Sequence, residues 1–336
     1  MSTAYLGTLQ SQDPLYDYLR KDVLPVMDRE VRDPRFHVSR LSGSNMVYRY
    51  DEERTRLSLI GKFYNFMEPY KARRLIGEFD NLKKARALGL TSLPNYVVRP
   101  ISREKKMGLG LLEEYIEGHD LDYYIRGAAY DGRHGRLKER LSELAYFLSE
   151  FHKRAGSGQR LKAGPPAEYF EKLLGKLYKK KLLDDRLLGE FRKLKELWLE
   201  RDCMREDNDV VIHGDATPTN FIFPREKGVI AIDLERMRTG DRMFDVGMVS
   251  GELKHAFIWR TGNKYTSEPY IGHFLAEYSG HFRKSEKMFR STMLRNPFFM
   301  AMTELRIARN GWLDRQHRIR LVQEARECLH WGLKLK

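Results

Sequence analysis

Two short stretches decide how this chain is interpreted: HGDATPTN at residues 213–220 and IDLE at residues 232–235. An apolar run that predicts a short buried strand leads into each of them, VVI at 210–212 and VIAI at 229–232. Asp215, Asn220 and Asp233 therefore stand at or just after the ends of predicted strands. We expect these three side chains to face one common space.

The residue types at these positions are those that phosphoryl transfer needs. An aspartate on a loop, here Asp215, can orient a hydroxyl nucleophile, while Asn220 and Asp233 offer hard oxygen ligands that suit Mg²⁺ bound mainly through phosphate oxygens. Neither cysteine nor a close pair of histidines competes for a softer metal. The structural alternative is that Asp and Asn only cap turns between strands and helices.

The composition limits the class of protein. The 336 residues include 61 Lys and Arg against 47 Asp and Glu, a formal net charge of +14 that favours anionic partners. A hydrophobic share of 41% excludes a mainly disordered chain. Cys203 and Cys328 alone make neither a disulfide framework nor a zinc site, so we expect a reduced, cytoplasmic setting. We expect no signal peptide and no transmembrane segment.

Hydrophobic patterning predicts an α+β protein with two lobes. Residues 1–34 are expected to form a helical extension, with Asp13 as its cap and Pro14 at the first helical position. Residues 35–116 alternate as β-β-β-α-β-β, which predicts a small lobe with an antiparallel sheet. Residues 117–336 are mostly helical in pattern and predict a larger lobe that begins after a polar linker. The expected elements of the small lobe are strands at 36–41, 46–50 and 57–64, a helix at 69–88, and strands at 96–98 and 109–115.

His213, Gly214, Asp215 and Asn220, followed by Asp233 and Glu235, resemble the motifs of the aminoglycoside phosphotransferase and choline kinase family. That family shares the protein-kinase-like fold, and the resemblance extends from about residue 36 to about residue 260. It implies an ATP- and Mg²⁺-dependent enzyme that moves the γ-phosphate to a hydroxyl of a small molecule. The fold that it implies matches the two-lobed pattern.

The resemblance also implies roles for individual residues. Asp215 matches the catalytic aspartate, and Asn220 and Asp233 match the magnesium ligands. Lys62 matches the lysine that contacts the α- and β-phosphates of ATP, and Glu78 matches its salt-bridge partner.

Other parts of the nucleotide site are implied in the same way. The turn SGSN at 42–45, with Gly43 and Ser44, matches the loop that covers the phosphates. Glu114, Tyr115 and Ile116 match the hinge whose backbone holds the adenine. The turn and following helix that support the catalytic loop are matched by Gly240, Asp241, Asp245 and Gly247.

The separate pieces differ in specificity. Lys62 alone, or Glu78 alone, would be an ordinary surface charge, and their places on the third strand and the following helix favour the functional interpretation. The 42–45 turn has a single glycine, which fits any hairpin. No G-x-x-x-x-G-K-[ST] motif occurs, which excludes a simple P-loop enzyme. We expect His213 and His152 to be structural and Glu235 to support the loop.

The acceptor is expected among the helices of the larger lobe, in the region of 157–209 and near the C-terminus. Because a polycationic aminoglycoside needs an acidic pocket, the basic composition favours a hydroxylated metabolite, and an anionic one fits it. Candidate lining residues, each of them also explicable as surface or core, are Asp120, Tyr123, Glu252, His255, Trp259, Arg260, Lys264 and Tyr265.

Two other functions remain open at this point. A protein kinase would share the spacing of Asp215 and Asn220, but Gly214 replaces the usual Arg, IDLE replaces Asp-Phe-Gly, and no Ala-Pro-Glu stop is evident. A non-catalytic module that binds nucleotides or nucleic acid would explain the net charge of +14, but no nucleic-acid-binding motif is recognisable.

Overall fold

The computed structural model describes residues 3–29, 31–41, 46–154, 156–162 and 164–336, and the chain divides into two compact units. Unit 1 comprises Met1–Glu117 and Ile230–Arg236, and unit 2 comprises Gly118–Val229 and Met237–Lys336. The first has a large antiparallel sheet and the second is mainly helical, which agrees with the predicted fold class. The 42–45 turn, with Gly43 and Ser44, lies outside the described residues.

Unit 1 is built on a six-stranded sheet in which each strand pairs antiparallel with its neighbours. The spatial order is β1-β2-β3-β4-β8-β7. The expectation that residues 1–34 form a helical extension is wrong for Thr3–Thr8, which forms the edge strand β1. Neither β1 nor the other edge strand, β7, has a clear apolar alternation in the sequence. The strands are β1 Thr3–Thr8, β2 Phe36–Leu41, β3 Met46–Glu52, β4 Ser58–Phe63, β7 Pro100–Glu104 and β8 Leu109–Glu114.

Helix α1, Pro14–Tyr18, covers one face of this sheet. As expected, Asp13 caps it by accepting a hydrogen bond from the Leu15 amide at 2.9 Å, and Pro14 occupies its first turn. The chain continues in a π-helical turn, Leu19–Val23, and a 3₁₀ turn, Pro25–Met27. The apolar core under these turns consists of Leu15, Leu19, Val23, Leu24, Phe36, Tyr50, Leu59, Leu109 and Leu112.

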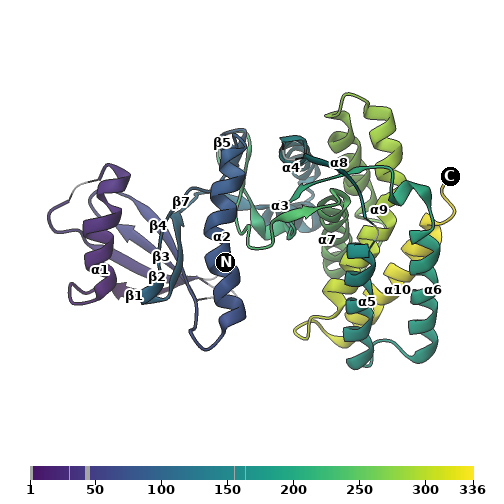
Figure 1. Ribbon diagram of the computed structural model, residues 1–336, viewed down its shortest axis with the longest axis horizontal. Helices are drawn as coiled ribbons and strands as arrows, with labels where there is room; N and C mark the ends of the chain where they lie inside the picture. Colours follow the sequence, from purple (N-terminus) through teal and green to yellow (C-terminus); the bar gives the residue numbers. More distant parts are fainter. Residues whose placement is uncertain (1–2, 30, 42–45, 155, 163) are drawn as a thin grey trace. The chain divides into compact units, whose positions relative to one another are not determined.

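Helix α2, Pro69–Ala87, covers the opposite face, as Figure 1 shows. Gly110 of β8 permits its close approach, because a Cβ atom at that position would lie 2.7 Å from Leu75 Cγ. A short hairpin of β5 (Thr91–Ser92) and β6 (Asn95–Val97) follows. The Val98 amide donates to the Ala231 carbonyl at 3.0 Å, which joins the segment 230–236 to unit 1.

Unit 2 contains most of the helices and several short strands. The segment 169–201, which has a helical pattern, belongs to two helices, because Asp184 caps the second by accepting from the Leu187 amide at 2.7 Å. Its helices are α3 Leu121–Asp131, α4 His134–Arg154, α5 Gly164–Lys179, α6 Asp185–Leu199, α7 Met243–Thr261, α8 Glu268–Gly280, α9 Ser285–Ala308 and α10 Arg315–Gly332.

The strands of unit 2 frame the predicted catalytic stretch. β11, Asn208–Ile212, lies between β10 (Gly156–Arg160) and β14 (Arg238–Gly240) in an antiparallel sheet. β12, Phe221–Phe223, pairs with β9, His119–Asp120. β11 therefore ends directly before His213, and β12 begins directly after Asn220. The other predicted strand of this region is β13, Val229–Ala231.

Helices α7 and α9 pack closely because α7 presents glycines to α9. A Cβ atom on Gly247 would lie 2.3 Å from Phe299 Cβ, and one on Gly251 would lie 2.6 Å from Thr303 Cβ. This contact sets which side chains of the two helices meet further along. Among the described residues, none of the helices combines the length and the apolar character needed to cross a membrane.

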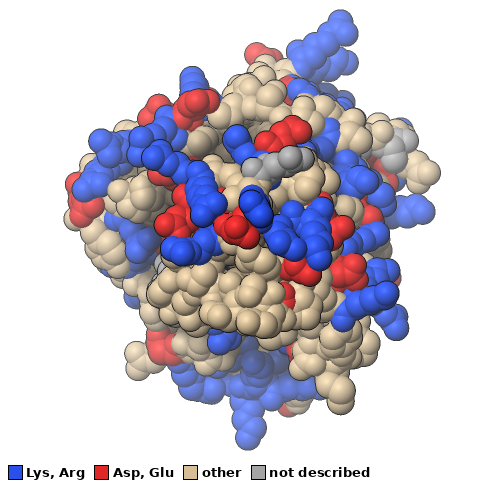
Figure 2. All heavy atoms as spheres, turned by 90° about the vertical axis from the view of Figure 1, so that its left-hand side faces the viewer, with Lys and Arg blue, Asp and Glu red and all other residues tan. Residues whose placement is uncertain are grey.

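The positive net charge is dispersed on the face shown in Figure 2. Lys and Arg side chains are scattered over this face, and Asp and Glu lie among them. A basic stripe of the kind that tracks a nucleic-acid backbone is not evident on this face.

Candidate active site

The loop that carries Asp215 is held from beneath by the carboxylate of Asp245. The amides of His213 and Gly214 donate to its two oxygens at 2.7 and 2.8 Å, and His152 Nε2 lies 3.1 Å from Oδ2. Asp245 lies in the first turn of α7, where the helix dipole favours a negative charge. The fully buried carboxylate thus fixes the backbone directly before Asp215.

The two histidines near this loop are structural, in agreement with expectation. His152 is buried, and its Nδ1 lies 2.8 Å from the hydroxyl of Tyr278, which is also buried. His213 is buried and its ring packs against Phe221, with 5.2 Å between ring centroids. Burial lowers the pKa of His152, so the neutral imidazole is the favoured form.

Asn220 closes the same loop. It lies at the end of a 3₁₀ turn, Pro218–Asn220, and its side-chain nitrogen donates to the Asp215 carbonyl at 2.9 Å. Because the nitrogen is used within the loop, the amide oxygen is the atom that Asn220 can offer to a cation. The carboxylate of Asp215 and the carboxamide of Asn220 are therefore held as one element of unit 2.

Lys62 lies at the centre of a cluster of carboxylates in unit 1. Its Nζ lies 2.7 Å from Glu78 Oε1 of α2 and 3.1 Å from Glu113 Oε1 of β8. The predicted pair of Lys62 and Glu78 is present, and Glu113 is an additional partner. Residues 62 and 113 share a face of the sheet because Lys62 pairs with Leu111 and Ile60 with Glu113 in the β4–β8 register.

The charges of this cluster do not balance. Burial would lower the pKa of Lys62, but Glu113, Glu78 and Asp233 together raise it well above its ordinary value. Burial raises the pKa of Glu78 to about 8, since the single ammonium is shared with Glu113 and Asp233. One ammonium therefore faces three carboxyl groups, and the raised pKa means that Glu78 holds a proton near neutral pH.

Asp233 is positioned by the same helix that carries Glu78. The side-chain nitrogen of Asn81 donates to the Leu234 carbonyl at 2.9 Å, and Arg74 forms an ion pair with Glu235. Asp233 itself has φ of 59°, in the left-handed region that Asp adopts more readily than most residues. Helix α2 thus fixes both Glu78 and the Asp233 loop, and Glu235 has the supporting role that was expected.

The predicted hinge is held tightly within unit 1. The amide of Glu114 donates to the Arg99 carbonyl at 3.2 Å and that of Tyr115 to the Ser58 carbonyl at 3.0 Å. The guanidinium of Arg49 stacks on the Tyr115 ring at 3.8 Å. Among the bonds of the described residues, the amide of Ile116 has no such acceptor. Of the three predicted hinge residues, Ile116 is thus the one whose amide is not used within unit 1 among the described residues.

Arg306 of α9 is a site residue that the sequence does not reveal. Its guanidinium forms an ion pair with Asp215 and lies 3.1 Å from Glu252 Oε1 of α7. The sequence around it has no motif, so its charge reads as an ordinary helix-surface charge. Glu113 was missed for a similar reason, because a charged residue at the end of a strand reads as solvent-exposed.

The candidate acceptor residues fall into separate groups. Glu252 joins the Arg306 network, and Arg260 pairs with Asp122 of α3. His255 Nδ1 lies 2.9 Å from His317 Nε2, and burial lowers the pKa of His255 to about 3.

The remaining candidates have contacts of their own. Asp120 caps α3 by accepting from the Tyr123 amide at 2.9 Å, and the Tyr123 ring stacks on His119. Lys264 pairs with Glu324 and Glu327, and Tyr265 is exposed. These contacts give Asp120 and Lys264 structural roles.

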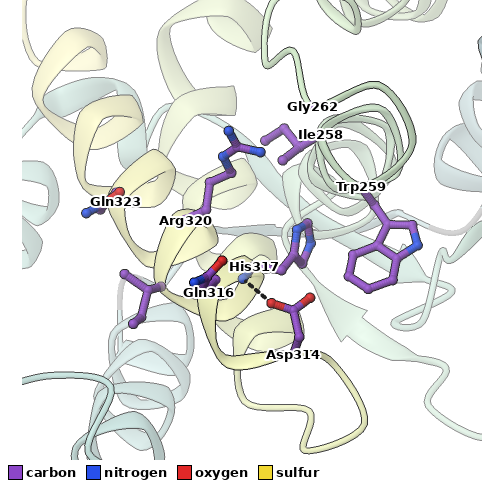
Figure 3. A pocket seen from close by; sticks show the side chains of 9 residues that line it. Ile258, Trp259, Gly262, Asp314, Gln316, His317, Arg320 and Gln323 are labelled. Atoms are coloured by element: carbon purple, nitrogen blue, oxygen red, sulfur yellow. Dashed lines mark hydrogen bonds between the residues drawn. The ribbon is translucent and has the colours of Figure 1, made fainter.

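A cavity of about 550 Å³ lies between α7 and α10 (Figure 3). The His317 imidazole lies between the two helices, and the indole of Trp259 lies edge-on to it with 4.7 Å between ring centroids. The lining residues are Ile258, Trp259, Gly262, Asp314, Gln316, His317, Ile319, Arg320 and Gln323.

A ready-made metal centre is not present: within the described ranges, no three Asp, Glu, His or Cys side chains converge to hold an ion. The two predicted magnesium ligands belong to different units, Asp233 to unit 1 and Asn220 to unit 2, and each offers a hard oxygen donor. Carboxylate and amide oxygens of this kind suit Mg²⁺ that takes most of its ligands from phosphate and water.

Comparison with known proteins places the chain in a family. The model of the phosphotransferase enzyme family named APH matches residues 37–283. No curated protein sequence matches the chain.

Solved structures share the fold. The streptomycin–ATP complex of APH(2")-IIa aligns with a TM-score of 0.55 and 16% identity over 95% of this chain and 97% of that one. Plasmodium vivax ethanolamine kinase aligns with a TM-score of 0.56 and 14% identity over 96% and 89%. Choline kinase LicA from Streptococcus pneumoniae aligns with a TM-score of 0.52 and 16% identity over 94% and 99%.

The structures establish the two-lobed kinase-like fold, and the family model covers most of the chain, including Lys62, Asp215 and Asp233. This chain belongs to the APH phosphotransferase enzyme family.

Proposed function

We propose that this phosphotransferase is a kinase that moves the γ-phosphate of ATP to a hydroxyl group of a small molecule. The observation that carries the proposal is the Asp215 loop, whose backbone is fixed by Asp245 and whose carbonyl is held by Asn220. A carboxylate held in this way can orient a hydroxyl with little loss of freedom at the moment of reaction.

The reaction follows from that placement. As the acceptor oxygen forms its bond to the γ-phosphorus, the bond from that phosphorus to the β,γ-bridging oxygen breaks, and ADP leaves with the electron pair. The hydroxyl proton passes to the carboxylate of Asp215 and then to solvent. Asp215 contributes mainly by positioning the nucleophile, because the transition state of phosphoryl transfer is loose.

The nucleotide is proposed to use residues of unit 1. Lys62, held by Glu78, contacts the phosphates, and Gly43 and Ser44 cover them. The backbone at Glu114, Tyr115 and Ile116 holds the adenine, with the Ile116 amide as donor. ATP is the favoured nucleotide since the similar APH(2")-IIa structure is a complex with ATP.

We propose Asn220 and Asp233 as the ligands of Mg²⁺, which supplies neutralisation of the phosphate charge when it is bound. The protein's own part is to hold Asn220 by its side-chain nitrogen and Asp233 by the α2 contacts at Leu234 and Glu235. Glu78 and Glu113 keep Lys62 in place beside Asp233.

Similar structures favour a small acceptor over a protein. They include kinases of ethanolamine, choline and the antibiotic amicoumacin. A cytoplasmic location is part of the proposal, since ATP is available there and Cys203 and Cys328 are both free thiols.

The test is ATP turnover by Asp215→Asn with Mg²⁺ and a panel of hydroxylated metabolites. We expect a loss of at least 10³-fold in turnover, with ATP affinity in equilibrium binding unchanged within threefold. Asp202→Asn, an exposed aspartate of the same unit, is the matched control and should keep full activity. Turnover by Asp215→Asn close to that of the unsubstituted protein would reject the assignment.

A further inference from the structure

We propose that the acceptor is an uncharged hydroxylated compound, such as a sugar or polyol, and that Arg306 excludes acceptors with an ammonium group beside the reacting hydroxyl. This inference rests on the proposed function, because it takes Asp215 as the residue that meets the acceptor. It concerns charge at that site, which the net charge of the chain does not decide.

Arg306 neutralises the carboxylates next to the reacting position. One guanidinium nitrogen forms an ion pair with Asp215 Oδ1, and the other lies 3.1 Å from Glu252 Oε1. Each of the three side chains is less than 15% exposed: 12% for Arg306, 12% for Asp215 and 14% for Glu252. The arginine is therefore a fixed component of this part of unit 2.

The next carboxylate in this region is also paired. Asp122 of α3 is close enough to Glu252 to raise its pKa, and Asp122 itself pairs with Arg260 of α7 and lies 3.3 Å from Arg126. Each carboxylate around the reacting position thus has an arginine partner. Among the described residues, these three carboxyl groups face three guanidinium groups, so the acids do not outnumber the bases here.

The cavity of Figure 3, further along α7, is also lined by equal numbers of acidic and basic side chains, apart from His317. Trp259, which lines it, lies seven residues after Glu252, about two helical turns or roughly 10 Å along the axis. The charged residues that line it are one acid, Asp314, and one base, Arg320, besides His317. Asp314 is already used in capping α10, where Oδ1 accepts from the His317 amide at 2.8 Å.

The rest of the lining suits a polar, uncharged body. Gln316 and Gln323 offer amide groups, Trp259 offers an aromatic face, and about 550 Å³ accommodates a mono- or disaccharide. An ammonium group beside the reacting hydroxyl would meet the carboxylates of Asp215 and Glu252, which are already paired with the Arg306 guanidinium, so it would gain little from them.

The experiment compares acceptors that differ only by an ammonium group. We would measure kcat/KM with ATP and Mg²⁺ for three pairs: choline and 3,3-dimethylbutanol, glucosamine and glucose, and the glucosamine disaccharide and cellobiose. For the unsubstituted protein, kcat/KM should be at least tenfold higher for the uncharged member than for the ammonium member of any pair that it phosphorylates.

Substitution of Arg306 should shift this preference. Arg306→Gln uncovers Asp215 and Glu252, so the preference for the uncharged member should fall at least tenfold, and Arg306→Lys should retain it. Arg290→Gln, an exposed arginine on the same helix, is the matched control. If Arg306→Gln does not fold, Glu252→Gln gives a second test. Because it removes a carboxylate, its kcat/KM for the ammonium compounds should be no higher than that of the unsubstituted protein.

Preference for the ammonium member by the unsubstituted protein would overturn the inference, as would an unchanged preference in a folded Arg306→Gln protein. Turnover of none of the six compounds would also count against it. The proposed function fails separately, when Asp215→Asn turns ATP over as fast as the unsubstituted protein.

Discussion

The ammonium of Lys62 lies 3.1 Å from the carboxylate of Glu113, although Lys62 already has Glu78 as a partner at 2.7 Å. Lys62 Nζ is thus held from two directions, by a helix and by the neighbouring strand. A lysine fixed in this way has one remaining direction for a phosphate oxygen. The arrangement leads to predictions on stability and on nucleotide binding.

Replacement of Lys62 by Met should destabilise the protein strongly. The substitution leaves Glu78 and Glu113, both almost fully buried, without their cation, which costs about 3–5 kcal/mol in the free energy of unfolding. Urea unfolding would measure this loss. The triple variant Lys62→Met, Glu78→Gln, Glu113→Gln should recover at least half of the lost free energy of unfolding. The control is Lys84→Ala, at an exposed lysine on α2, which should cost less than about 0.5 kcal/mol. No recovery in the triple variant would contradict the electrostatic explanation.

Glu113→Gln should tighten the binding of ATP. The substitution removes one of the three carboxyl groups around Lys62 and so lowers the negative potential that repels the phosphates, while Glu78 still holds Lys62 in place. We expect the dissociation constant for ATP to fall about two- to fivefold at low ionic strength. Glu78→Gln should instead weaken binding, because Glu78 makes the shorter contact with Lys62. Isothermal titration calorimetry with both variants would decide, and weaker binding by Glu113→Gln would refute the prediction.

The stability of unit 2 should depend on pH through Glu252. Burial raises the pKa of this carboxyl group to about 7, against the attraction of Arg306, so the folded protein keeps a proton that the unfolded chain releases near pH 4.5. Between these values the folded state binds more protons, and its stability therefore falls as the pH rises from about 4.5 to 7 and is then constant.

The whole shift corresponds to about 3.4 kcal/mol, of which about 2.5 kcal/mol falls between pH 5 and 8. The free energy of unfolding would be measured with urea at pH 5 and at pH 8. Its fall between these values should be larger by about 2.5 kcal/mol in the unsubstituted protein than in Glu252→Gln. Equal pH profiles for the two proteins would show that Glu252 does not carry the effect.

Much of the small lobe could be predicted because its elements have local signals. Asp13 and Pro14 identify the start of α1, and the alternation over 36–63 identifies three strands of the sheet. The edge strands could not be predicted, since β1 depends on pairing with β2 and has few apolar residues of its own.

A motif fixes the spacing of Asp215, Asn220 and Asp233, and the structure holds Asp215 and Asn220 in one loop, while their catalytic and metal-binding roles stay predictions. Lys62 and Glu78 could be identified from their places on a strand and the next helix, and the structure pairs them. Glu113 and Arg306 could not, because each owes its role to a contact made only in the folded chain. Glu113 contacts Lys62 of the neighbouring strand. Arg306 contacts Asp215, which lies 91 residues earlier in the sequence.

Asp245→Asn should impair both stability and turnover. The carboxylate accepts from two backbone amides and faces His152, and an asparagine would turn an NH₂ group toward one of these donors. We expect a loss of about 2–4 kcal/mol in the free energy of unfolding. Displacement of the loop should reduce kcat at least tenfold even where the protein remains folded. Circular dichroism and ATP turnover would measure these effects, and full activity of the variant would contradict the role given to Asp245.

Gly247→Ala tests whether the close approach of α7 and α9 sets the Glu252–Arg306 pair. The new Cβ atom would lie 2.3 Å from Phe299 Cβ, so the two helices must separate. We expect a loss of about 1–3 kcal/mol in the free energy of unfolding. Because Arg306 and Glu252 then move apart, the KM for the acceptor should change more than the KM for ATP. The matched control is Gly272→Ala, an exposed position within α8 where a Cβ meets nothing within 4 Å. That variant should gain up to about 1 kcal/mol from higher helix propensity. A Gly247→Ala protein as stable as Gly272→Ala would show that the helices accommodate the methyl group without moving apart.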